Sequence, residues 1–144
     1  MSRVRVIAAL MYGVTGIISV ILGSVYLLRD EFMPYHAQAL SQAWESLDAA
    51  TQTLLLALMD VAGAGWAVTG VLVCVLVWFP FRAGDRWARW VVPGTLIALY
   101  VPILLATLEV LTTTPATPPW YGNAAALTAT TIGFFLDQPW RRSG

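Results

Sequence analysis

The chain has 144 residues, of which 58 % are hydrophobic and 11 % are charged, and its eight basic residues, all arginine, balance eight acidic ones. The apolar residues form four long runs. These runs exclude a soluble helical protein, because soluble cores rarely contain uncharged apolar stretches of about 18 residues or more. We expect the lipid bilayer as a partner and no nucleic acid. The absence of lysine is typical of GC-rich bacterial genomes.

The four runs predict an all-α membrane protein with four transmembrane helices in a single domain, residues 1–144. They cover residues 4–28, 54–79, 90–111 and 120–136. A hydrocarbon core of about 30 Å needs roughly 20 apolar residues, so the fourth run is short, and local thinning of the bilayer or snorkelling flanking residues can compensate. With their flanks, the expected spans are about 4–28, 53–79, 90–112 and 120–137. The first run is longer than the core of a signal peptide, so we expect a retained helix.

The arginines predict the orientation. They gather in three segments, at the two ends and in the loop near residue 85, and these alternate with two loops poor in basic residues. Short loops rich in arginine stay in the cytoplasm, so both termini are expected there and the protein is expected in the bacterial cytoplasmic (inner) membrane. The arginines of these three segments are Arg3, Arg5, Arg82, Arg86, Arg89, Arg141 and Arg142.

Tryptophans lie near the ends of the expected spans. Indole rings prefer the headgroup level of a bilayer, so we interpret them as membrane anchors rather than ligand-stacking groups. The residues concerned are Trp44, Trp78, Trp87, Trp90, Trp120 and Trp140.

The first outer loop, residues 29–52, predicts a short amphipathic helix on the membrane surface. Pro34 suits the first turn of a helix, and Leu40, Trp44 and Leu47 recur at helical spacing. Asp48 then predicts an N-cap for the second span.

Small residues predict which faces of the spans pack together, because helices in lipid approach closely where glycine and alanine line up. One such stripe runs along each span, and together they predict a compact four-helix bundle. The stripes are Ala9, Gly13, Gly16 and Gly23; Gly63, Ala67, Gly70 and Cys74; Gly94 and Ala98; and Ala125, Ala129 and Gly133.

Two acidic residues, Asp60 and Glu109, interrupt the second and third runs. Each extends the small-residue stripe of its span, so both are expected to point inward, in the outer half of the membrane, with His36 just above them. Such residues are candidates for a ligand or proton site, and His36, Asp60 and Glu109 together also suit a divalent metal such as zinc. The alternative is that each acid is a structural polar clamp.

Other chemistries are excluded by residue counts. Cys74 is the only cysteine, which excludes thiol oxidoreductases that use cysteine pairs, and His36 is the only histidine, which excludes a bis-histidine haem within one chain. There is no phosphate-binding loop, no nucleophile elbow and no helix with paired metal ligands. A haem or metal shared between subunits stays open, and the sequence identifies no particular cofactor.

Three segments resemble those of a group of small bacterial four-helix integral membrane proteins with no assigned activity: residues 32–36 (FMPYH), 80–90 (PFRAGDRWARW) and 114–120 (TPATPPW). The resemblance spans most of the chain and implies the same fold.

Three functions fit these observations. The first, which we favour from the sequence, is a non-catalytic accessory or structural subunit that docks with other membrane chains or with itself. The second is a protein that binds a ligand, lipid or metal in an outer-leaflet polar pocket. The third is a proton-coupled transporter acting as an oligomer.

Overall fold

The computed structural model describes residues 2–141, and these residues are helical or irregular, with no strand. Three helices are long and apolar enough to cross a membrane, and they are α1, α4 and α3 with the turn that continues it to Phe81. The 18-residue α5 does not belong to that set. The all-helical class and the membrane-compatible helices are thus confirmed, and the fourth span stays a prediction. The helices are α1 (Arg3–Leu27), α2 (Pro34–Leu40), α3 (Ala49–Leu76), α4 (Ala88–Thr113) and α5 (Trp120–Asp137).

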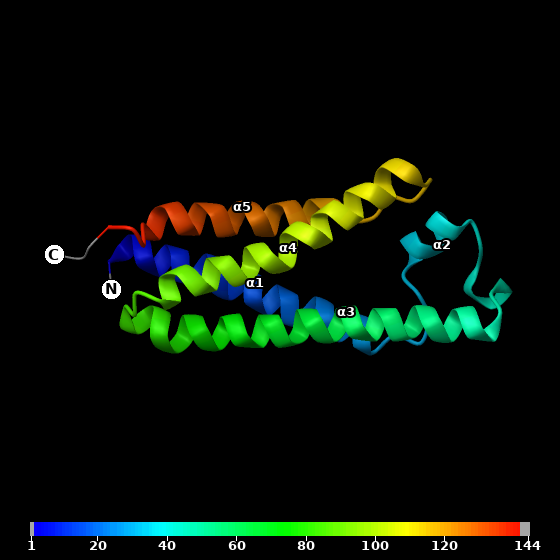
Figure 1. Cartoon of the computed structure of the whole chain (residues 1–144), viewed down its shortest axis with the longest axis horizontal. Coiled ribbons are helices and arrows are strands. Elements are labelled where there is room, and N and C mark those ends of the chain that lie inside the picture. The colour runs from blue at the N-terminus through cyan, green and yellow to red at the C-terminus, as the bar shows by residue number, and fades with distance from the viewer. Residues whose placement is uncertain (1, 142–144) are drawn as a thin grey trace.

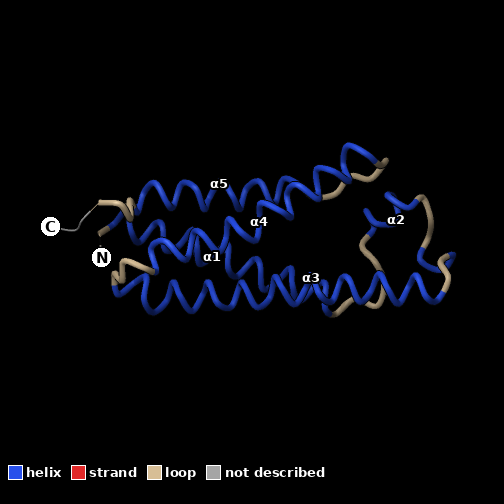
Figure 2. The backbone as a smooth tube through the Cα atoms, in the orientation of Figure 1, coloured by secondary structure: helices blue, strands red, loops and turns tan. Residues whose placement is uncertain are grey.

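The four long helices run along the long axis of the molecule in alternating directions (Figure 1). The described ends of the chain and the turn between α3 and α4 lie at one end, which we call the arginine-rich end. The short helix α2 lies at the other, which we call the α2 end (Figure 2). Toward the α2 end, α4 diverges from α3 (Figure 1).

Glycines set the contact between α1 and α3. A Cβ atom added at Gly23 would lie 2.5 Å from the backbone nitrogen of Ala67, and one at Gly70 would lie 2.6 Å from the carbonyl oxygen of Gly16. Both distances are too short for any side chain, so the two backbones touch. The small-residue stripes predicted on these two helices are confirmed at Gly16, Gly23, Gly63 and Gly70.

The same rule gave the wrong face for α4. Gly94 and Ala98 are exposed, and a Cβ atom added at Gly94 would meet nothing within 4 Å. The buried face of α4 instead carries larger residues, Val92, Leu96 and Tyr100. The core they join includes Tyr12 and Phe81, whose rings form an edge-to-face pair with centroids 5.5 Å apart.

The two helix starts predicted from Pro34 and Asp48 are confirmed. Pro34 is the first residue of α2, and the Asp48 carboxylate caps α3 by accepting hydrogen bonds from the backbone nitrogens of Ala50 and Thr51 at 3.0 and 3.1 Å. The surface helix is shorter than the pattern suggested. It ends at Leu40, the following Ser41 adopts a left-handed conformation with φ 52°, and only a single 3-10 turn follows at Trp44–Ser46.

The predicted anchor tryptophans lie near the ends of helices, and all but the half-buried Trp44 are exposed. Near the arginine-rich end, the Arg82 guanidinium lies over the Trp78 ring, 4.4 Å from its centroid. Trp78 belongs to a π-helical turn, Val77–Phe81, that contains Pro80.

Candidate functional site

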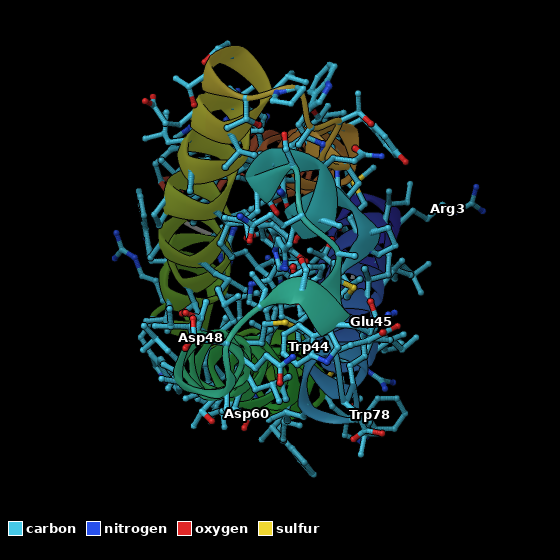
Figure 3. The ribbon with its side chains drawn as sticks, turned by 90° about the vertical axis from the view of Figure 1, so that its right-hand side faces the viewer. Arg3, Trp44, Glu45, Asp48, Asp60 and Trp78 are labelled. Carbon is cyan, nitrogen blue, oxygen red and sulfur yellow. The ribbon has the colours of Figure 1, made fainter. Side chains whose placement is uncertain are left out.

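The two acidic residues predicted inside the protein lie on its outside. Asp60 and Glu109 are both exposed, and Figure 3 shows Asp60 on the outer rim of α3, directed away from the other helices. The expectation that both point inward was therefore wrong. Neither of them lines the pocket to which His36 contributes, described below.

Helix phase explains the error on α3. Its buried residues Met59, Gly63, Gly70 and Val73 lie four, seven and three positions apart, close to whole helical turns, and define one face. Asp60 follows Met59 directly, so it is rotated by about 100° from that face. On α4, Glu109 was assigned from Gly94 and Ala98, and because that stripe faces outward, Glu109 does too.

No metal centre forms among these residues. In residues 2–141, no group of three or more His, Cys, Asp or Glu side chains lies close enough to hold a metal ion. The arrangement of His36, Asp60 and Glu109 as one zinc-binding cluster therefore has no support in this fold.

His36 lies in α2 and is half-buried. Its Nδ1 atom accepts a hydrogen bond from the backbone nitrogen of Met33 at 3.3 Å, so the proton of the neutral ring resides on Nε2. Burial, and secondarily the charge of Arg29, lowers the pKa of His36 below its ordinary value. The ring is thus neutral at pH 7 and presents Nε2–H as a hydrogen-bond donor.

A cavity beneath α2 has a volume of about 520 Å³. Its walls come from the second half of α1, from Trp66 of α3, from α4 and from the start of α5, and residues of α2 and of the segments before α2 and α5 complete them. The α1 part extends from Ile18 to Tyr26, which corresponds to a depth of about 12 Å. Two of the segments that carried the sequence resemblance, residues 32–36 and 114–120, contribute to this lining.

Aromatic rings form one side of this cavity. Trp66 of α3 lies between Tyr26 and Tyr100, with ring centroids 5.8 and 6.3 Å away. The Tyr100 hydroxyl forms a hydrogen bond of 2.8 Å with the buried Ser19 hydroxyl, which fixes the ring. The remaining lining is mostly aliphatic, so the pocket suits an apolar molecule.

Polar groups gather at the mouth and on one wall. The hydroxyls of Tyr26 and Tyr35 share a hydrogen bond, which uses one of their two protons and leaves the other available. The Asn123 amide donates to the Thr107 hydroxyl at 3.2 Å and leaves its own carbonyl oxygen as an acceptor. With Nε2–H of His36, the pocket thus offers two donors and an acceptor.

The loops above the pocket are joined by one side chain. Gln38 of α2 accepts hydrogen bonds from the backbone nitrogen and the hydroxyl of Thr117, at 3.1 and 3.3 Å. Thr117 precedes Pro118 and Pro119, which line the pocket. The segment around α2 and the segment before α5 therefore close over the cavity together.

A second polar cluster, which was not predicted from the sequence, lies at the arginine-rich end. Asp137, the last residue of α5, is buried and accepts hydrogen bonds from Nε of Arg89 at 2.8 Å and Nε of Arg5 at 3.2 Å. Arg89 also donates through Nη2 to the carbonyl oxygens of Asp137 and Gln138, at 2.7 and 3.1 Å. One carboxylate thus joins α1, α4 and α5.

The sequence held a signal for this cluster. Asp137 directly follows the fourth apolar run, at the end of the molecule where the arginines concentrate. Guanidinium groups are therefore available near an acid in that position, but the packing of the helices decides which of them it meets. Next to it, the Tyr12 ring packs on Gly133, and the buried Tyr12 hydroxyl has no hydrogen-bond partner among residues 2–141.

We expect the segment around α2 to open as the pH falls below about 6.5. The closed segment keeps His36 neutral, whereas an open segment binds a proton near the ordinary pKa. The closed state is therefore fully stabilised above that pKa and loses stability as the pH falls toward the lowered one. Hydrogen exchange of residues 33–40 between pH 7.5 and 5, corrected for intrinsic rates, measures this.

The matched variant is His36→Asn, whose Oδ1 replaces Nδ1 as the acceptor for Met33 but does not titrate. It should exchange at a corrected rate independent of pH. If the variant opens on acidification as the wild type does, another group is responsible.

Comparison with known proteins adds no assignment to this geometry. No protein-family model, no curated protein and no solved structure matches the chain. The function must therefore be inferred from the pocket and its surroundings.

Proposed function

We propose that the protein is a multi-pass membrane protein whose pocket at the α2 end binds an amphipathic molecule with a long apolar part and a small neutral head. The observation that carries this proposal is the cavity of about 520 Å³ with apolar walls and polar groups at its mouth. Pockets for small molecules commonly have volumes of about 300–1,000 Å³ and combine such walls with a few convergent polar groups.

The polar groups favour a neutral or oxygen-rich head. Nε2–H of His36 and the spare hydroxyl proton of the Tyr26–Tyr35 pair are donors for a carbonyl, ether or hydroxyl oxygen. Within residues 2–141, no charged side chain lines the cavity, so an ionised head would lose hydration without an opposite charge in return. Membrane alcohols, glycerides and quinones have the required chemistry.

The setting is a bacterial cytoplasmic membrane crossed by four spans in a compact bundle, with α5 as the fourth. Both termini are then cytoplasmic, because arginines gather at that end, and the pocket opens in the outer leaflet. The α2 end carries few basic residues, which agrees with this orientation.

We expect Ala106→Trp to abolish ligand retention, because the indole would occupy the cavity that Ala106 lines. Native mass spectrometry of the protein purified in mild detergent, with oleyl alcohol added as the probe, should show a bound alcohol on the wild type and none on the variant. The matched control is Leu105→Trp, which places the same ring on the neighbouring residue, outside the pocket and 63 % exposed.

Retention that is equal in all three proteins would place the alcohol on the lipid-facing surface and contradict the pocket. Oleylamine, which has a cationic head on the same chain, should bind more weakly than the alcohol. Equal binding of the two would contradict the neutral head.

A second candidate is the accessory subunit, and one observation favours it. Asp60 lies six residues, or about 9 Å, inside the second apolar run and is exposed. A carboxylate facing lipid costs about 2.5–3.5 kcal/mol on insertion scales, so a partner helix that donates a hydrogen bond to it would stabilise both chains. The same mass spectra would reveal such a partner as an added protein mass that Asp60→Leu removes.

A further inference from the structure

A long groove runs along the outside of α1 near the arginine-rich end, away from the pocket. It has a volume of about 500 Å³ and lies between α1 and the end of α3. The α1 residues that line it, from Val6 to Ile17, recur at helical spacing and therefore share one face of the helix. It shares no lining residue with the pocket at the α2 end.

Gly13 explains why the groove exists. A Cβ atom added at Gly13 would meet only Val77 Cγ1, at 4.0 Å, whereas one added at Gly16 would lie 3.2 Å from the Gly70 carbonyl oxygen. The helices touch at Gly16 and separate at Gly13, so the small residue leaves an open space between them. The floor of this space includes Cys74.

The length of the groove matches one leaflet. From Val6 to Ile17 a helix rises about 16 Å, and half of a hydrocarbon core of about 30 Å is about 15 Å. All the lining residues are apolar except the cysteine and Arg82. One extended acyl chain therefore fits its length and its chemistry.

Arg82 marks the end of the groove that faces the headgroups. It is exposed, and the Trp78 ring holds its guanidinium 4.4 Å from the ring centroid. Among residues 2–141 the ion pairs involve Arg5, Arg29 and Arg89 but not Arg82, so its charge has no carboxylate partner in that range. The segments at this end carry six arginines and two aspartates within the described residues.

We propose that this groove binds one acyl chain of an anionic phospholipid from the leaflet at the arginine-rich end, with the lipid phosphate on Arg82. The phosphate supplies the negative charge that Arg82 lacks, and a guanidinium binds phosphate through paired N–H donors. Basic sites between helices at the cytoplasmic side are suited to anionic headgroups.

The test uses the full chain in detergent and native mass spectrometry with phosphatidylglycerol or phosphatidylcholine carrying identical acyl chains. The wild type should retain phosphatidylglycerol about fivefold more than phosphatidylcholine, the ratio that one favourable arginine contact gives. Arg82→Gln should reduce that preference to about one. Arg86→Gln, which removes an exposed arginine of the same turn outside the groove, should keep it.

A second pair of variants tests the acyl chain. Gly13→Leu fills the groove without a backbone clash and should lower retention of both lipids, whereas Gly94→Leu adds the same side chain in open space on α4 and should not. Equal retention of both lipids by the wild type, equal effects of Arg82→Gln and Arg86→Gln, or equal effects of the two leucine variants would each overturn the proposal.

Discussion

Asp137→Asn is expected to lower the free energy of unfolding by about 3–5 kcal/mol, the loss typical of a buried ion pair that is deprived of one partner. The Arg89 side chain is only 6 % exposed, so the variant leaves a guanidinium buried without an opposite charge. Denaturation of the protein in detergent micelles, followed by circular dichroism, measures the change. Asp85→Asn, an exposed aspartate at the same end, is the control and should change stability by less than about 0.5 kcal/mol.

The two arginines should not be equivalent. Arg5 is 22 % exposed and forms a single bond to Asp137, whereas Arg89 also holds two backbone carbonyls at the end of α5. Arg89→Leu should therefore cost more stability than Arg5→Leu. The double variant Asp137→Leu with Arg89→Leu should recover part of the stability lost in the single variants. It leaves no buried charge without a partner, and Arg5 can extend toward water. A double variant less stable than Asp137→Asn would contradict this explanation.

Gly70→Leu is expected to separate α1 from α3 and to cost about 3 kcal/mol or more, at the upper end of overpacking effects. The added Cβ would lie 2.6 Å from the Gly16 carbonyl oxygen and 2.8 Å from the Val20 nitrogen, which are backbone atoms that cannot rotate away. The midpoint of thermal unfolding in detergent should fall accordingly.

The control lies five residues away on the same helix. Gly65→Leu adds an identical side chain where a Cβ meets nothing within 4 Å, so it should leave the midpoint nearly unchanged. Leu72→Ala removes an apolar side chain that is 52 % exposed and should also have a small effect. If Gly65→Leu and Gly70→Leu destabilise equally, the contact between α1 and α3 is not the one described.

The order of the helices and their approximate positions were predictable from the sequence, because both depend on neighbouring residues. The apolar runs marked all four long helices, although the composition of the fourth does not by itself mark a span. Asp48 and Pro34 marked helix starts through bonds and angles that are local to the chain. The break at Ser41 was missed because the apolar spacing of Leu40, Trp44 and Leu47 carries no information about a left-handed residue.

The rotation of each helix was only partly predictable. In a membrane protein the lipid-facing surface and the interior are both apolar, so the hydrophobic pattern does not identify the buried face. Small residues identified it on α1 and α3, where the backbones touch, and failed on α4, which packs through Leu96 and Tyr100. The prediction that Glu109 points inward was wrong because the α4 stripe faces outward. The prediction for Asp60 was wrong because Asp60 lies one residue out of phase with the buried face of α3.

What the sequence determined, therefore, is a chain of apolar helices with arginines gathered toward one end of the molecule, because hydrophobic length and charge are properties of each segment. The tertiary structure alone decided which polar groups meet. Arg5 and Asp137 are 132 residues apart, and Gln38 and Thr117 are 79 apart. Contacts at such separations, like the pocket at the α2 end and the groove beside Gly13, follow from how the helices pack against one another, which no local pattern records.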